Sequence, residues 1–338
     1  MRAMKNYSIK DIAELAGVSV ATVSRVINDN GRFSEETRKK VLKVIEETGY
    51  KMNYSAKNLR MNKSFTIGIL VPDISNYFFS DVVQRLEEIL FAKGYSTIIC
   101  NTSRSSEKEL AYLRILEGKG VDGLIVISGA EAFEFASSSA EKKIPYICID
   151  REPKKKEDTV FISSNHYQGA FESAEELIRE GCQHPVIAMH NQKSTSAKER
   201  LKGFKDALKK NSISFDPAHH LLSIDIQSTD FEKSLHTFLK KNPTTDGIFS
   251  INDLIALELL LLLKKKHISV PQKIKLIGFD DTTSGKYTTP SLSSVKQNTA
   301  LIATHAVETL LELINNKGEL GRQIVVPVSL VLRESSTS

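Results

Sequence analysis

From Phe65 onward, short continuous apolar runs alternate with amphipathic stretches. The runs include "FTIGILV", "DGLIVIS", "IPYICID", "DGIFSI" and "IKLIGFD", and helical patterns such as "FSDVVQRLEEILFAKG" and "AKERLKGFKDALKK" lie between them. Continuous rather than alternating apolarity is typical of strands buried on both faces, in parallel sheets covered by helices. The remaining length of about 270 residues suits two such doubly wound α/β sheets.

Polar residues close each apolar run. They are expected to gather where the carboxyl ends of the parallel strands meet. Carboxamides, carboxylates and arginines bind hydroxyl groups, and a phenyl ring lies well against the C–H face of a sugar, so we expect a neutral polyol site. Caps and turns at strand ends would give the same pattern, and for Asp253 and Asp281 an N-cap role is favoured. The candidate ligand contacts are Asn76, Phe78, Phe79, Asp150, Arg151, Asn165, Arg200, Asn252, Asp280 and Gln297.

The first 63 residues have a different texture. They hold 13 Lys and Arg against seven Asp and Glu, whereas the whole chain has a net charge of +5. Ser8 and Asp11 form the pattern of a capping box, and the helix that they open has Ile9, Ile12, Ala13, Leu15 and Ala16 on its apolar face and ends at Gly17. Ser19 caps a second helix, and Ser34 a third with Val41, Leu42, Val44 and Ile45 inward. A small basic unit of three helices, two of them joined by a tight turn, indicates a helix-turn-helix that binds a polyanion.

The second helix, from Val20 to about Asn28, has the chemistry of a recognition helix. Its valines and Ile27 are expected to face inward, and short hydroxyl side chains on the other face can donate to phosphates. Arg25 is the long side chain able to contact guanine O6 and N7, and Val20 and Ala21 would lie against base edges. A generic three-helix bundle is the alternative. The candidate DNA contacts in this region are Ser8, Ser19, Val20, Ala21, Thr22, Ser24, Arg25 and Asn28.

The segments "SIKDIAELAGVSVATVSRVIN" and "SEETRKKVLKVIEETGY" closely resemble the headpiece of the LacI/GalR family of bacterial transcription regulators, and the resemblance continues through "NYSAKNLR". In that family the last segment forms a hinge helix on DNA, and a leucine in the minor groove kinks the operator. The matching residue here is Leu59, with Ala56 and Arg60 beside it, and such a wedge is physically reasonable at a flexible base step.

The rest of the chain resembles the family's effector-binding core, which is similar to the type I periplasmic sugar-binding proteins. The resemblance implies a headpiece at 1–52, a hinge helix and linker at 53–63, and a core at 64–338. It also implies three crossings between lobes, near Asn165, Ser294 and Arg322. The N-terminal lobe would comprise about 64–164 and 294–322, and the C-terminal lobe about 165–293 and 323–335.

The motifs "SNYFF", "IDRE", "AKERLKGF", "IND", "GFDDT" and "VKQN" are similar to those of the periplasmic ribose-binding protein. Carried over, the ten candidate contacts become pentose contacts, with D-ribose or a similar monosaccharide as effector. Two departures are Tyr77, where a proline is usual, and Ile226, near which an aromatic is expected. A sugar phosphate, sugar acid or purine is the alternative, with Lys193 and the "KKKED" run at 154–158 as basic groups; a phosphocarrier protein as partner is possible but not indicated.

Other functions fit less well. A glycosidase would need two carboxyls held around a bond, and the chain lacks the short motifs of hydrolases and nucleotide-binding enzymes, so no catalytic residue is expected. Cys100, Cys148 and Cys182 are scattered and predict neither a disulfide nor a metal site, and no cofactor is expected. No apolar run is long enough for a membrane span, so a cytoplasmic protein is expected.

The sequence therefore predicts a homodimeric repressor that binds a palindromic operator. An effector between the lobes would change their angle and act on residues 53–61, which have poor helix propensity on their own. A C-terminal heptad helix for further assembly is absent, which favours a dimer.

Overall fold

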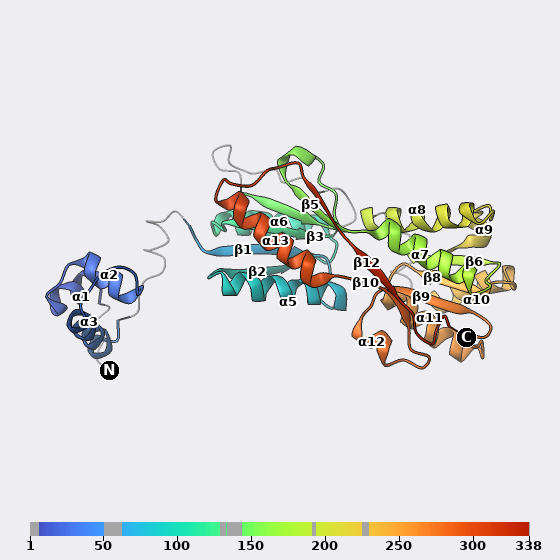
Figure 1. Cartoon of the computed structure of the whole chain (residues 1–338), viewed down its shortest axis with the longest axis horizontal. Coiled ribbons are helices and arrows are strands. Elements are labelled where there is room, and N and C mark those ends of the chain that lie inside the picture. The colour runs from blue at the N-terminus through green and yellow to red at the C-terminus, as the bar shows by residue number, and fades with distance from the viewer. Residues whose placement is uncertain are drawn as a thin grey trace. The chain divides into compact units, whose positions relative to one another are not determined.

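The computed structural model of the protein describes residues 7–50, 63–128, 133, 144–190, 194–224 and 230–337. The chain divides into two compact units, residues 1–64 and 65–338. The first is helical, and the second holds two six-stranded sheets (Figure 1).

The helical unit contains α1 (Ile9–Ala16), α2 (Val20–Ile27) and α3 (Glu35–Thr48). The expected capping box of Ser8 and Asp11 is present, and Ser19 and Ser34 cap the next two helices. Gly17 ends α1 at a φ of +64°, a left-handed conformation that favours glycine. The three helices enclose a small core of Ile12, Ala13, Ala16, Val23, Val26 and Val41.

Two leucines do not lie on the apolar faces where the sequence analysis put them. Leu15 is 55% exposed and Leu42 is 45% exposed. Successive helical residues point about 100° apart, and Ala16 and Val41 take the neighbouring inward positions. The helix boundaries were predicted correctly, but the apolar stripe is narrower than expected.

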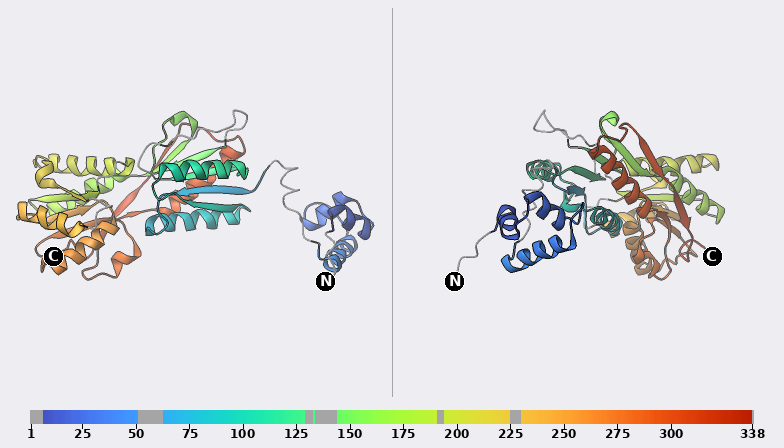
Figure 2. Two further views of the ribbon diagram at one scale, coloured as in Figure 1. Left: turned by 180° about the vertical axis from the view of Figure 1, so that it is seen from behind. Right: turned by 60° about the vertical axis from the view of Figure 1, so that its left-hand side comes forward.

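The first sheet of the larger unit has the strand order β11-β5-β4-β3-β1-β2, and all its pairs are parallel. Helix α6 (Ser106–Gly118) covers one face, while α5 (Tyr77–Ala92) and α13 (Thr299–Ile314) pack on the other (Figures 1 and 2). Buried residues on both faces explain the unbroken apolar runs. The strands are β1 (Thr66–Val71), β2 (Ser96–Asn101), β3 (Gly123–Ile127), β4 (Tyr146–Ile149), β5 (Val160–Ser164) and β11 (Gln323–Val326).

The second sheet has the order β12-β10-β9-β8-β6-β7, and only the β10–β12 pair is antiparallel. Its strands are β6 (Pro185–His190), β7 (Leu221–Ile224), β8 (Gly247–Ser250), β9 (Lys275–Asp280), β10 (Ser293–Gln297) and β12 (Val328–Val331). The helices that follow or precede them are α7 (His166–Arg179), α8 (Thr195–Lys210), α9 (Pro217–His220), α10 (Phe231–Lys241), α11 (Asp253–Lys265) and α12 (Thr283–Lys286), and a 3-10 turn, η1, spans Lys156–Asp158. The two doubly wound lobes match the expected fold class.

The chain crosses between the lobes three times. The first crossing lies at Asn165, between β5 and α7. The second and third come later in the chain than the sequence analysis placed them. β10 runs to Gln297 within the second sheet, and β11 still pairs with β5 in the first, so the third crossing lies at Pro327 rather than near Arg322. β10 and β11 extend past the expected crossing points because the pairing of β10 with β9 continues to Lys296 and that of β11 with β5 continues to Val326.

Helices α7 and α8 lie side by side at unusually close range. A Cβ atom on Gly203 would stand 2.2 Å from the carbonyl oxygen of Tyr167 and 3.0 Å from the backbone nitrogen of Phe171. Only glycine allows two helix backbones to approach this closely. The approach brings α8 against the first turn of α7, where the chain has just crossed between lobes.

We expect Gly203→Ala to lower the free energy of unfolding by about 1–3 kcal/mol, because the added methyl group meets backbone rather than a flexible side chain. Gly118→Ala is the matched control, since Gly118 also lies in a helix and nothing stands within 4 Å of an added Cβ. Thermal and urea denaturation of both variants measure the difference. Equal stability of the two variants would contradict the close packing described.

Candidate DNA-binding helix and ligand cleft

The outer face of α2 offers polar side chains around one arginine. Ser19 accepts a hydrogen bond from the Thr22 amide at 3.1 Å, and the hydroxyls of these two residues are 2.9 Å apart. Val23 and Val26 are buried, whereas Ala21, Arg25 and Asn28 are exposed. Arg25 makes no ion pair with the described residues, and its stem lies beside Gly31, whose φ is +99°. The helix thus presents an available guanidinium next to short side chains.

Other candidate DNA contacts have local roles or lie beyond what the structure describes. The hydroxyl of Ser8 donates to Asp11 in the capping box at 2.7 Å, and the Asn28 side chain donates to the Ser24 carbonyl at 2.6 Å. Val20 packs partly against the core of the helical unit. Ala56, Leu59 and Arg60 lie outside the described residues. All eleven contacts to DNA stay predictions.

In the larger unit, strand ends and helix starts from both lobes line one cavity. From the first lobe come residues at the start of α5 and after β2, β3 and β4; from the second come residues at the ends of β6, β8 and β9 and on α8. The lining residues are Asn76, Phe78, Phe79, Arg104, Ser128, Asp150, His190, Ser194, Ser196, Ala197, Arg200, Ile251, Asn252 and Asp280.

Several strand-end residues of the cavity adopt backbone conformations that are uncommon outside glycine. The φ angles of Ser128, Asp150 and Asp280 are +44°, +51° and +121°. Such conformations carry strain and are concentrated at functional sites. Here they lie where β3, β4 and β9 reach the cavity.

A buried chain of hydrogen bonds joins the two lobes beside the cavity. Asp150, on the first lobe, accepts from the Ser164 amide and the Ser163 hydroxyl at 3.1 Å each. His166 Nε2 lies 2.8 Å from the same carboxylate oxygen, and Arg200 Nε on α8 donates to His166 Nδ1 at 3.3 Å. His166 therefore stands between an acid of one lobe and an arginine of the other.

Arg200 is also held by groups of its own lobe. Its guanidinium donates to the Ile251 carbonyl, lies over the Phe279 ring with Cζ 3.6 Å from the centroid, and is 3.9 Å from the carboxylate of Asp280. Gln297 donates to that same Asp280 oxygen at 2.7 Å. Arginine, carboxylate and carboxamide thus form one connected group.

Burial dominates the ionisation of these residues. It raises the pKa of Asp280 to about 8, with Asp253 and Asp150 adding like charge and Arg200 opposing. Burial also acts to raise the pKa of Asp150, but His166, Arg200 and the Ser164 amide hold it below its usual range. For His166 burial lowers the pKa, and the nearby Asp150 does not fully offset this. The pKa values of two aspartates in one cavity, Asp150 and Asp280, are therefore shifted in opposite directions.

Seven of the ten residues expected to contact the effector line the cavity, and three do not. Asn165 caps α7 by accepting from the Gln168 amide at 3.1 Å, and Gln297 acts through Asp280. Arg151 does not line the cavity. Its Nη1 and Nη2 donate to Oε2 and Oε1 of Glu109 on α6, at 2.5 Å and 3.2 Å. As effector contacts, all ten stay predictions.

The N-cap roles favoured for Asp253 and Asp281 are wrong. Asn252 caps α11, and Thr282 stands at the N-cap of α12. The buried Asp253 carboxylate instead accepts from the Thr282 amide at 2.6 Å and the Ser294 hydroxyl at 2.6 Å. Asp281 pairs with Arg333 at 2.5 Å. Asp253 thus links the start of α11 to the segment after β9 and to β10, and Asp281 links the segment after β9 to the segment after β12.

Seven lining residues were missed: the five polar residues Arg104, Ser128, His190, Ser194 and Ser196, and the apolar Ala197 and Ile251. Ser128 and His190 close "DGLIVIS" and "PVIAMH", so the strand-end rule applied to every strand would have found them. Arg104 lies three residues beyond β2, and no periodicity signals that position. Tyr77, noted as a departure, hydrogen-bonds across the lobes to Thr283 at 2.7 Å. Ile226 and Lys193 lie outside the described residues.

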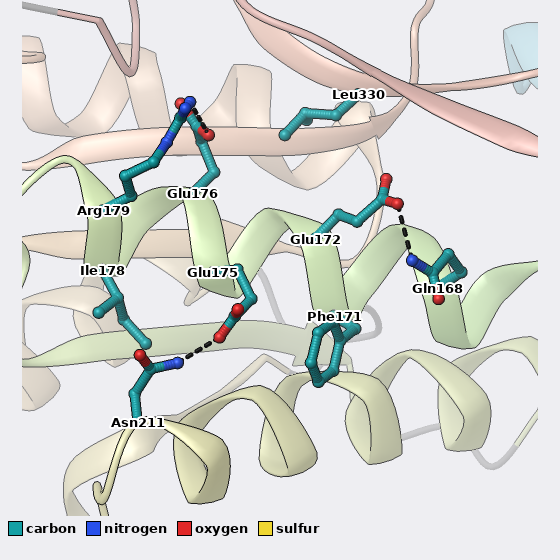
Figure 3. Close-up of a pocket in the computed structure, with 9 residues that line it drawn as sticks. All are labelled: Gln168, Phe171, Glu172, Glu175, Glu176, Ile178, Arg179, Asn211 and Leu330. Carbon is teal, nitrogen blue, oxygen red and sulfur yellow. Dashed lines mark hydrogen bonds and ion pairs between the residues drawn. The ribbon is translucent and has the colours of Figure 1, made fainter.

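A second hollow, of about 650 Å³, lies on the outer face of α7 near Asn211 and Leu330 (Figure 3). Its side chains mostly satisfy one another: Gln168 donates to Glu172, Asn211 to Glu175 and Arg179 to Glu176. None of the strand-end residues of the cavity lines it. Its size alone gives no reason to place an effector there.

Within the described residues no cluster of His, Cys, Asp and Glu is arranged to hold a metal ion, and all three cysteines are buried.

Comparison with known proteins identifies the two units. Residues 8–53 match the model of bacterial regulatory proteins of the lacI family, and residues 174–336 match that of the periplasmic binding protein-like domain. The ribose operon repressor of Halalkalibacterium halodurans is 31% identical over 97% of both chains. The chain belongs to the lacI family. The sucrose operon repressor of Streptococcus mutans is 34% identical to this lacI-family chain, over 97% of it and 98% of the relative.

Among solved structures, the lac repressor dimer bound to operator and the anti-inducer ONPF aligns with a TM-score of 0.83 and 25% identity, over 99% of this chain and 100% of that one. The similarity to LacI/GalR regulators and the fold class expected from the sequence are thereby confirmed. This lacI-family member is a DNA-binding transcription regulator rather than an enzyme. No described helix is long and apolar enough to cross a membrane.

We expect Arg151→Met to lower the free energy of unfolding by about 3 kcal/mol, because it leaves Glu109 as a largely buried, uncompensated charge. Adding Glu109→Leu should restore a large part of that loss. Urea denaturation of the single and double variants measures the coupling. If the two substitutions lower the free energy of unfolding additively, Arg151 and Glu109 are not coupled and the ion pair does not stabilise the fold.

Proposed function

We propose that the protein is a homodimeric repressor whose affinity for a palindromic operator is controlled by a small polyhydroxylated effector in the cavity between the lobes. The observation that carries this proposal is the convergence of polar groups from both lobes, with Phe78 and Phe79, on one cavity. The rings of these two residues are 5.4 Å apart at an interplanar angle of 64°, and such rings pack well on the C–H face of a sugar. D-ribose is the first monosaccharide to test, and the relative named ribose operon repressor supports that choice.

On the DNA side, α2 would enter the major groove, with Arg25 reading a guanine edge and Val20 and Ala21 lying against neighbouring bases. Two such helices, related by a two-fold axis, would read the two half-sites. Leu59 of each subunit would insert at the centre of the operator and bend it. The hydroxyls of Thr22 and Ser24 would position the helix on phosphates.

Control would act through the lobes. An effector that contacts Asn76 and Asp150 on one side and Arg200 and Asn252 on the other changes the angle at which the lobes are most stable. In a dimer, that angle sets the separation of the two hinge segments. By linkage, if the effector weakens operator binding, the operator weakens effector binding by the same factor.

We expect Arg25→Ala to weaken specific operator binding by about 1–3 kcal/mol and to relax sequence preference at one position, because a bidentate base contact is lost. Leu59→Ala should remove most of the specific affinity while non-specific binding remains. Fluorescence anisotropy with operator and with scrambled DNA separates the two effects. Operator affinity unchanged by both substitutions would contradict the DNA-binding model.

We expect Arg200→Ala to bind the operator normally but no longer to respond to the effector, because the side chain that joins His166, Asp280 and the ligand is gone. Arg179→Ala is the control, since Arg179 is an exposed arginine outside the cavity. Operator release by D-ribose and related sugars is measured for both, with melting temperature as a check on folding. Release from Arg200→Ala at wild-type sugar concentration would overturn the site.

A further inference from the structure

Among the described residues, one buried ring nitrogen at the cavity has no hydrogen-bond partner. His190 ends β6 and is 8% exposed, and its Nδ1 makes no hydrogen bond within the part of the chain that the structure describes. Burial, followed by the charges of Arg104 and Arg200, lowers the pKa of His190 to about 4. Its ring is therefore neutral near pH 7 and lies in a field of positive charge. A buried polar atom without a partner calls for an explanation, and here the atom lines a cavity.

Arg104 is a second cavity residue for which the described part of the chain supplies no hydrogen bond or ion pair. It is half-buried, and no described carboxylate lies within ion-pair distance of its guanidinium. Its Cζ lies 5.8 Å from the centre of the Phe79 ring. Burial lowers its pKa, and the carboxylate of Asp73 acts on it only from beyond ion-pair range. Arg104 thus brings a positive charge to the cavity that no carboxylate among the described residues neutralises by direct contact.

The acids of the cavity are already engaged. Asp150 accepts from Ser163, Ser164 and His166, and Asp280 is held by Gln297 and faces Arg200. Arg104 and His190 thus line the cavity with no hydrogen bond or ion pair to the described residues at the guanidinium or at Nδ1, whereas both carboxylates already have neighbours. An occupant that offers oxygen acceptors complements this arrangement better than one that offers donors alone.

Helix dipoles also favour negative charge in the cavity. Three long helices begin at the cavity, α5 after Asn76, α8 after Ser194 and α11 after Asn252. A helix N-terminus favours negative charge. Ser194 and Ser196, whose hydroxyls are 3.2 Å apart, line the cavity at the start of α8.

We propose that the effector carries an anionic oxygen group, a carboxylate or a phosphate, which binds between Arg104 and His190 while its hydroxyl groups face Asp150, Arg200 and Asn252. The inference rests on the proposed function, because it assumes that this cavity takes the effector. Among polyhydroxylated effectors, it selects sugar acids and sugar phosphates over neutral sugars such as D-ribose. Arg104 is then the residue that decides between charged and neutral sugars.

The test compares D-ribose, D-ribonate, D-ribose 5-phosphate and inorganic phosphate by isothermal titration calorimetry on the full chain. We expect at least one anionic sugar to bind about tenfold or more tightly than D-ribose, and Arg104→Gln to abolish that preference, since a hydrogen bond to a charged group is worth about a factor of ten or more. His190→Phe, which keeps an aromatic ring but removes both ring nitrogens, should reduce the preference as well. Binding of D-ribonate but not D-ribose 5-phosphate, or the reverse, identifies the anion.

Arg114→Gln is the matched control, because Arg114 is exposed on α6 beyond the Arg104 loop. It should bind every probe as the wild type does. If no probe distinguishes Arg104→Gln from the wild type, the anion site is overturned, and release of the operator by D-ribose alone would still support the proposed function. If anionic sugars bind through Arg104 but leave operator affinity unchanged, the anion site stands and the proposed control of DNA binding fails.

Discussion

Strands covered by helices on both faces leave little room for polar side chains except at their ends, and the rest of this structure depends on that constraint. The middles of β1, β3, β4 and β9 are buried and apolar. In a parallel sheet the carboxyl ends lie along one edge, so the polar chemistry of each lobe is confined to a single rim. Two such rims facing each other make one cavity.

The contact that joins those rims most directly is His166, at the first crossing. It bonds to Asp150 of one lobe and Arg200 of the other, and Gly203 allows α8 to lie close enough to α7 for this to happen. Tyr77 and Thr283 form a second link between lobes, on a more exposed side. The angle between the lobes is therefore tied to residues that line or border the cavity.

Periodicity and cap chemistry were sufficient to predict both units, because buried strands and capped helices leave strong local patterns. The strand-end rule placed Asn76, Asp150 and Asp280 at the cavity: Asp150 directly follows β4, Asp280 ends β9, and Asn76 comes five residues after β1. It did not anticipate that Arg151 lies outside the cavity lining, paired with Glu109, which is 42 residues away in sequence. It also failed for Asp253, whose partners Thr282 and Ser294 come from other loops. Tertiary partners of this kind leave no trace in local sequence.

The three crossings mean that neither lobe is a continuous stretch of chain. The first lobe consists of the core residues up to Asn165 together with α13 and β11. The second lobe consists of the segment from α7 to β10 together with β12. Exchange of one lobe between related genes would need three junctions, whereas exchange of the helical unit needs one, near residue 64. A single recombination event near residue 64 can therefore join a DNA-binding unit to a different complete core, whereas no single event can transfer one lobe intact.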